Sequence, residues 1–145
     1  MKWVAAIAAF VVLSFLGCPA SPVTAEEAVS ETIQDVAEAA RRARPKDFMQ
    51  SFSEAFEGPG MSRQKLKAFI TRRFLSRGGV AVHLGEISVE VAADQKTATA
   101  SFVATFPGST DRLLGKADQY SFLLTFSLEN GVWKITSQQN SPISG

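Results

Sequence analysis

Residues 119–136 read QYSFLLTFSLENGVWKIT. Large apolar side chains occupy every second position on both sides of Asn130-Gly131, which is the alternation expected of half-buried β-strands. Asn-Gly is the dipeptide that favours the type I′ turn of a two-residue hairpin. The stretch therefore predicts an antiparallel hairpin, with Trp133 and Ile135 pointing into the core.

Two further strands are predicted before this hairpin. Apolar positions alternate through residues 98–106, and they also alternate through residues 80–91 with a slip of one position at Gly85-Glu86. An inserted residue there, as in a β-bulge, keeps the apolar side chains on one face. Small side chains in 98–104 beside large aromatic ones in 120–128 indicate a curved sheet.

The segment before the strands has helical periodicity. Thr24 and Glu27 have the spacing of a capping box, and Ser62 can cap a later helix that Gly78-Gly79 would end. Three apolar stripes recur at helical steps, and their members are Val29, Ile33, Val36 and Ala40, then Phe48, Phe52, Ala55 and Phe56, then Leu66, Phe69, Ile70 and Phe74.

Helices followed by strands predict an α+β domain, in which three N-terminal helices pack on a curved four-stranded antiparallel sheet. The composition agrees with a globular domain, because 46% of the residues are hydrophobic and 20% are charged. Eleven phenylalanines supply large side chains for a core. We expect one domain over residues 25–145.

The N-terminus has the pattern of an export signal. Lys2 precedes an uncharged run, WVAAIAAFVVLSFL over residues 3–16. Fourteen residues are too few to span a bilayer, which takes about 20, but they suit the apolar region of a signal peptide.

Two cleavage sites compete. Gly17-Cys18 directly follows the apolar run and resembles a bacterial lipoprotein leader, which implies a signal peptide over 1–17, a lipid anchor on Cys18 and a tether over 18–24. The alternative is ordinary cleavage after Ala25, at the small-residue pattern Val23-Thr24-Ala25. The position of Cys18 beside the apolar run favours the lipid anchor.

The formal net charge is +1, and Lys2 in the leader contributes one positive charge, so the domain without its leader is neutral. This charge gives no reason to expect nucleic acid as a partner. The third helix is locally basic. Its cations could attract it to an anionic membrane surface, or they could simply form a solvated helix face.

The order of elements, ending in Gly131-Val132-Trp133-Lys134-Ile135, resembles the nuclear transport factor 2-like superfamily, whose fold is a cystatin-like cone. Residues 56–63 (FEGPGMSR), Phe74-Leu75 and residues 80–85 resemble a group of small exported bacterial proteins of that superfamily, many with lipoprotein leaders. The resemblance covers about residues 28–138. It implies a fold rather than one activity, because the superfamily includes isomerases, dehydratases, ligand binders and interaction domains.

Few residues are candidates for chemistry. His83 is the single histidine, and its alternation with Val82 and Leu84 predicts the outer face of the sheet. Asp94 and Asp111 fall in expected turns, where Asp commonly supports the backbone. With one cysteine and one histidine, no metal site is expected, and neither a phosphate-binding loop nor a cofactor site is present.

Three residues remain as candidate contacts for a ligand or partner. Tyr120 begins a strand on the apolar face, where it could present its hydroxyl at the mouth of the cone or pack in the core. Leu113 and Leu114 lie in a loop longer than a standard hairpin connection. They could cover the open end of the cone or form an exposed recognition patch.

We therefore expect a non-enzymatic protein of the periplasmic face of the cell envelope, held by a lipid anchor, that binds a partner protein or a small apolar ligand. The sequence does not decide between a monomer and a homodimer. The alternative is a small cofactor-independent enzyme, of isomerase or dehydratase type, that uses the cone as its active site.

Overall fold

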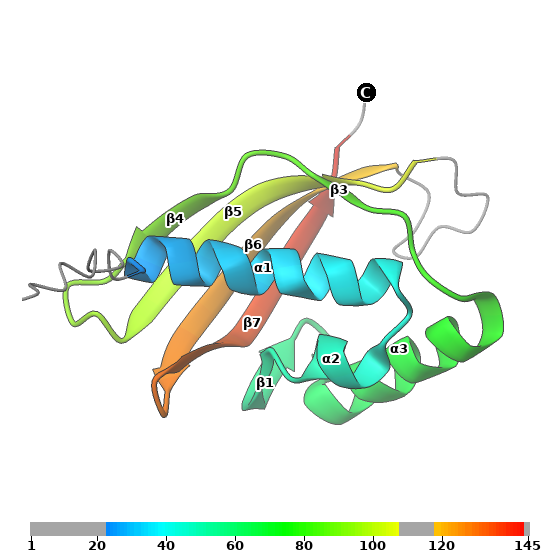
Figure 1. Cartoon of the computed structure of the whole chain (residues 1–145), viewed down its shortest axis with the longest axis horizontal. Coiled ribbons are helices and arrows are strands. Elements are labelled where there is room, and N and C mark those ends of the chain that lie inside the picture. The colour runs from blue at the N-terminus through cyan, green and yellow to red at the C-terminus, as the bar shows by residue number, and fades with distance from the viewer. Residues whose placement is uncertain (1–22, 108–117, 144–145) are drawn as a thin grey trace, which may run out of the picture.

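The computed structural model describes residues 23–107 and 118–143. Its helices are α1 (Ala25–Arg41), α2 (Pro45–Met49) and α3 (Arg63–Arg77). Its strands are β1 (Phe52–Gly58), β2 (Met61–Ser62), β3 (His83–Leu84), β4 (Ser88–Val91), β5 (Thr97–Thr105), β6 (Gln119–Glu129) and β7 (Val132–Pro142). Figure 1 shows α1 lying across one face of the sheet, with α2 and α3 below its C-terminal half.

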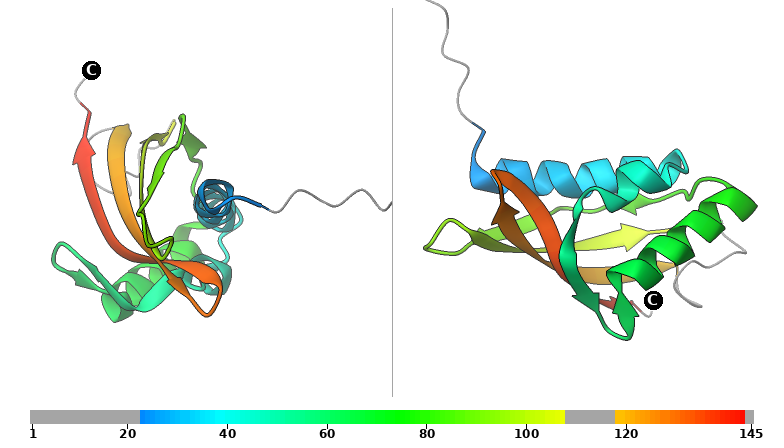
Figure 2. Two further views of the ribbon diagram at one scale, coloured as in Figure 1. Left: turned by 90° about the vertical axis from the view of Figure 1, so that its left-hand side faces the viewer. Right: turned by 90° about the horizontal axis from the view of Figure 1, so that it is seen from below.

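The described strands form one sheet in the order β2-β1-β7-β6-β5-β3, and β4 also pairs with β5. Neighbouring strands are antiparallel except for β1 and β7, which are parallel. The sheet is curved, and the three helices lie together on its inner side (Figure 2). The α+β class and the curved sheet are thus as the sequence predicts.

The hairpin at the centre of the sheet is confirmed. Asn130 and Gly131 both have positive φ, at 51° and 77°, as a type I′ turn requires. Phe126 of β6 pairs with Ile135 of β7, and both side chains are fully buried. Trp133 is buried as predicted, with only 6% of its surface exposed.

The first and third helices begin as predicted. Thr24 and Glu27 form the capping box of α1, and Ser62 accepts a hydrogen bond from the backbone of Lys65 at the start of α3. The α3 helix ends at Gly78, whose φ of 74° suits glycine. Phe69 was expected in the buried stripe of α3, but 38% of its surface is exposed.

Gly79 brings the chain close to the end of α1. A Cβ at this position would lie 2.0 Å from the carbonyl oxygen of Arg41, so no larger residue fits without a backbone shift. The next residue, Val80, donates its N–H to the Ala40 carbonyl at 2.9 Å. This contact holds Val80 and Val82 against α1, where both are buried.

The predicted second helix is wrong in its extent. It ends at Met49, and Phe52–Gly58 is strand β1. Phe48, Phe52 and Phe56 are four residues apart, a spacing that suits one face of a helix but also one face of a strand, because four is an even number. Parallel pairing with β7 favours the strand, and Ala55, which was expected in the helical stripe, is exposed.

The prediction of four strands is also wrong, since the sheet has seven. Two of the additional strands are β1 and β2. A further strand arises because residues 80–91 do not form one bulged strand but break into β3 and β4, both paired with β5. Gly85 donates its N–H to the carbonyl of Val103 at 2.8 Å at the break. The direction of the side chains is nevertheless as predicted, because Val82 is buried while His83 is exposed.

Hydrogen bonds attach β1 and the segment before it to the central hairpin. Ile135 donates its N–H to the Ser51 carbonyl at 2.8 Å. Glu129 accepts hydrogen bonds from the hydroxyls of Ser127, at 2.7 Å, and of Ser53, at 3.2 Å. These two hydroxyls, that of Ser127 foremost, hold the pKa of the Glu129 carboxyl below its usual range.

Truncation of Trp133 tests the position of the core. Trp133→Ala should lower the free energy of unfolding by about 3–5 kcal/mol, as is typical of a buried large aromatic side chain. Its neighbour Val132 is 52% exposed, so Val132→Ala should change stability by less than about 0.5 kcal/mol. Denaturant unfolding measures both, and equal costs for the two variants would contradict the inward direction of Trp133.

Candidate ligand-binding cavity

A cavity of about 430 Å³ lies between the inner face of the sheet and the helices. The sheet supplies its floor through side chains of β5, β6 and β7. The α1 helix, the segment around Val80 to Leu84 and the first half of α3 supply its walls. Gly58, Pro59 and Met61, at the turn between β1 and β2, line another part of it.

The floor of the cavity is mainly aromatic. The rings of Phe102 on β5 and Phe122 on β6 stack with centroids 5.3 Å apart and planes only 9° apart. Ala104 on β5 and Ala37 on α1 belong to one buried cluster with Val82, and all three line the cavity. These small side chains leave room that larger ones would fill.

Two polar side chains complete the lining, those of Gln138 and Asn140 on β7. Gln138 lies opposite Leu124, and Asn140 lies opposite Phe122. Gln138 is half-buried and Asn140 is exposed. Within the described residues, neither side-chain amide has a hydrogen-bond partner. Each amide has both a donor and an acceptor that a bound molecule or water could use.

An extra residue in β7 aims these amides at the cavity. Thr125 pairs with Ser137 but Phe126 pairs with Ile135, so Thr136 is the additional residue of a β-bulge. The Thr136 hydroxyl donates to the Thr125 carbonyl at 3.2 Å. Without the bulge, strict alternation from Ile135 would turn Gln139 inward; with it, Gln139 is exposed.

The sequence predicted the roles of two titratable residues correctly. His83 is exposed on the outer side of the sheet and pairs with Thr105. Asp94 supports its turn by accepting the N–H of Lys96 at 2.9 Å and that of Thr97 at 3.3 Å. The hydrogen bond from the Lys96 backbone is the main reason that the pKa of Asp94 is lowered.

Tyr120 packs in the core, which is one of the two roles that the sequence left open. Its side chain is buried, with 4% of its surface exposed, and its ring meets that of Phe106 edge to face at 6.2 Å. Phe106 lines the cavity, whereas Tyr120 is not among the lining residues. Tyr120 therefore supports the floor from the end of the sheet.

The other candidates, Cys18, Leu113, Leu114 and Asp111, lie outside the described residues, and their roles stay predictions. In residues 23–107 and 118–143 no group of acidic, histidine or cysteine side chains could hold a metal ion. No helix in those same ranges is long and apolar enough to cross a membrane.

Gln138 and Asn140 could not be identified from the sequence because apolar alternation ends at Ile135. The strand continues to Pro142 through a polar stretch, Thr136 to Ser141. A signal was present, since β6 is eleven residues long and an antiparallel partner needs similar length to satisfy its backbone. No sequence pattern of similar strength indicates the bulge itself.

Replacement of Gln138 tests whether its amide is unpaired. Gln138→Leu should raise the free energy of unfolding by about 0.5–1 kcal/mol, because an apolar side chain suits the apolar lining better than an amide without a partner. Gln139→Leu, on the opposite face, should leave stability within about 0.5 kcal/mol. Loss of more than about 1 kcal/mol in Gln138→Leu would mean that the amide holds the fold together instead.

No protein-family model matches the chain, and no curated protein matches its sequence. Solved structures do resemble it. Bd1075 of Bdellovibrio bacteriovorus superposes with a TM-score of 0.69 at 13% identity, over 80% of this chain but only 40% of that one. The chain thus spans less than half of that protein.

Two further structures match over most of both chains. An NTF2-like protein with a cystatin-like fold from Novosphingobium aromaticivorans has a TM-score of 0.64 at 23% identity, over 82% of each chain. A candidate dehydratase of the NTF2-like family from Streptomyces avermitilis has a TM-score of 0.67 at 17% identity, over 83% of this chain and 96% of that one. The chain therefore has the cystatin-like fold of the nuclear transport factor 2-like proteins.

Proposed function

We propose that this domain binds a small, largely apolar molecule in the cavity and holds its polar group with Gln138 and Asn140. The observation that carries the proposal is the composition of the lining, which is apolar and aromatic apart from two amides brought inward by a bulge. Ligand sites commonly combine an apolar wall with a few convergent polar groups. Bulges are frequent beside functional sites, where they redirect side chains.

The size and shape of the cavity indicate the class of ligand. A volume of about 430 Å³ falls in the range of about 300–1,000 Å³ that small-molecule sites occupy. The stacked rings of Phe102 and Phe122 give the floor an aromatic surface on which an aromatic or otherwise apolar group could pack. Burying such a group would supply about 25 cal/mol for each square ångström of apolar surface removed from water.

The amides favour a ligand with one oxygen-bearing end. Each carboxamide donates through its nitrogen and accepts through its oxygen, so a hydroxyl, a carbonyl or a carboxylate can be bound. A ligand that satisfies the amides gains affinity over one that leaves them unpaired. The pair therefore gives the cavity a preference for an apolar molecule with a polar end over a pure hydrocarbon.

The second candidate function is an enzyme of dehydratase type. Two structures with this fold are candidate dehydratases, one of them of scytalone dehydratase type. General acid–base catalysis needs a titratable side chain within reach of the substrate. The polar side chains that line the cavity from the described residues are carboxamides, which do not exchange protons near neutral pH. Carboxamides as the polar side chains of the lining therefore favour binding over catalysis.

Filling the cavity tests the binding proposal. N-phenyl-1-naphthylamine, an apolar dye with one N–H, should bind the full chain and brighten. Ala104→Phe places a ring in the cavity and should weaken dye binding at least about tenfold, a loss of about 1.4 kcal/mol. Ala81→Phe adds the same ring at an exposed position and should bind as the unaltered chain does.

Fluorescence titration measures these affinities, and thermal melting checks that Ala104→Phe remains folded. Equal affinity of the two Phe variants for the dye would contradict binding in this cavity. The apolar run of residues 3–16 can itself bind an apolar dye in every variant, so the comparison rests on the difference between the two variants.

We also propose that the domain lies in the cell envelope. This proposal rests on the apolar run of residues 3–16 followed at once by Gly17-Cys18, in a lipoprotein-like pattern. An exported, lipid-held binding domain could take up apolar molecules close to a membrane. The alternative, cleavage after Ala25, would release the domain from the membrane.

Substitution of Cys18 tests the anchor. In cells, the unaltered protein should incorporate radioactive palmitate and fractionate with membranes. Cys18→Ser should lose the label and leave the membrane fraction, because the serine hydroxyl cannot form the thioether to the lipid. An unlabelled wild-type protein whose mature N-terminus is Glu26 would contradict the lipid anchor and favour cleavage after Ala25.

A further inference from the structure

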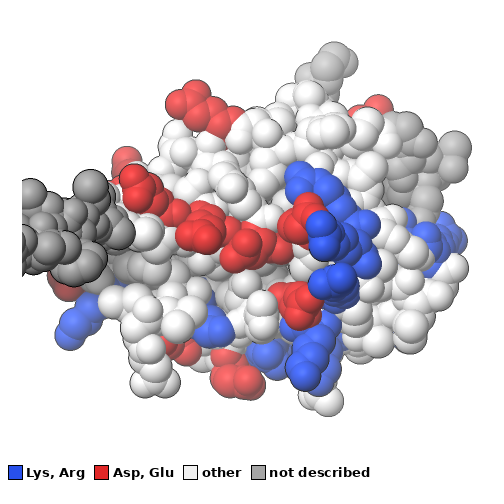
Figure 3. Space-filling view, viewed as in Figure 1, with Lys and Arg blue, Asp and Glu red and all other residues white. Residues whose placement is uncertain are grey.

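Charge is divided unevenly between the helices. The α3 helix, RQKLKAFITRRFLSR, contains six basic residues and no acidic one. The α1 helix, AEEAVSETIQDVAEAAR, contains five acidic residues and one basic one. Figure 3 shows the result, with acidic side chains along α1 and basic ones where α1 ends and towards α2 and α3. The basic residues of α3 are thus not balanced by acidic residues on the same helix.

The outer side of α3 also carries a strip of uncharged side chains, of which Leu75 is the one large apolar member. Leu66, Ile70 and Phe74 are buried towards the core, so the opposite side of the helix faces outward. Ala68, Thr71 and Leu75 follow one another there at steps of three and four residues. Leu75 is 81% exposed, the largest value among the exposed large apolar side chains of the described residues.

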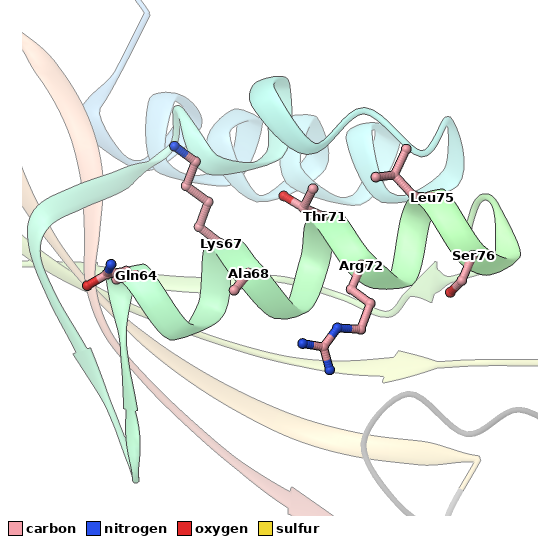
Figure 4. A pocket seen from close by; sticks show the side chains of 7 residues that line it. All are labelled: Gln64, Lys67, Ala68, Thr71, Arg72, Leu75 and Ser76. Carbon is pink, nitrogen blue, oxygen red and sulfur yellow. The ribbon is translucent and has the colours of Figure 1, made fainter.

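Two cations flank this strip. Lys67 and Arg72 line the same open hollow as Ala68 and Leu75, and Figure 4 shows their side chains pointing to opposite sides of the helix. Both are exposed, and within the described residues neither forms an ion pair. The hollow runs along the open surface of the helix and so does not enclose a small molecule.

We propose that this outer face of α3 docks on an anionic lipid surface. An apolar strip flanked by Lys and Arg is the arrangement by which interfacial helices contact bilayers, with the apolar side chains among the lipids and the cations at the headgroups. The aliphatic parts of Lys67 and Arg72 can reach along the strip while their charges meet phosphate groups. The helix has no acidic residue to repel such a surface.

This docking is independent of the cavity and of the lipid anchor. The strip faces outward from α3, whereas the cavity is lined by the opposite, inner side of the helix through Leu66 and Ile70. A domain held on the bilayer by α3 would keep α1, with its acidic side chains, away from the anionic surface.

Binding of the full chain to vesicles tests the proposal. Vesicles of phosphatidylglycerol and phosphatidylcholine in equal parts are compared with vesicles of phosphatidylcholine alone. The apolar run of residues 3–16 binds both kinds, so the readout is the ratio of the two affinities. Lys67→Gln with Arg72→Gln should reduce this ratio about 25-fold, or roughly fivefold for each cation removed.

Matched variants separate position from total charge. Lys96→Gln removes one exposed cation from another element and should reduce the ratio by less than about twofold, against about fivefold for Lys67→Gln alone, because Lys96 lies away from the docked face. Leu75→Gln should weaken binding to anionic vesicles, whereas Leu123→Gln, at an exposed position on β6, should not.

Equal losses in the α3 variants and in their matched variants would overturn the proposal. So would a shift from dimer to monomer in Leu75→Gln, measured by analytical ultracentrifugation, because it would assign the strip to a second copy of the chain. High salt should abolish the preference for anionic vesicles in the unaltered chain, and a preference unaffected by salt would also contradict docking through Lys67 and Arg72.

Discussion

The register between β6 and β7 is the constraint on which the other features depend. It is fixed at one end by the Asn130-Gly131 turn and in the middle by the pairing of Phe126 with Ile135, two of the most deeply buried side chains. Ile135 also pairs with Phe52, so the position of β1 follows from the same register. Beyond Ile135 the extra residue Thr136 changes which side chains face inward, and so determines the polar part of the cavity.

The bulge divides β7 into a part that packs in the core and a part that lines the cavity. Before it, β7 contributes Trp133 and Ile135 to the buried core; after it, the strand contributes Gln138 and Asn140 to the lining of the cavity. Gln138 is half-buried against an apolar lining where an apolar side chain would pack better, and such a cost is common where a residue serves binding rather than folding. The small side chains of Ala37 and Ala104 also serve binding rather than stability, because they leave space that a larger residue could fill.

Much of the fold could be predicted because local signals agree with the tertiary structure. The hairpin turn, the capping box of α1 and the glycine end of α3 each depend on residues close in sequence. Strand β1 could not be recognised, because Phe48, Phe52 and Phe56 satisfy a helix and a strand equally, and only pairing with the distant Ile135 decides between them. The amides of the cavity were missed for a related reason, since a bulge is a property of two paired strands and not of one.

The central claim is that Gln138 and Asn140 contact a ligand inside the cone. Intermolecular nuclear Overhauser effects between N-phenyl-1-naphthylamine and the labelled full chain test it most directly. The account predicts contacts from the dye to the side-chain amides of Gln138 and Asn140 and to the ring of Phe102, with none to Gln139. Contacts confined to Gln139 or to Leu75 on the outside of the domain would contradict it.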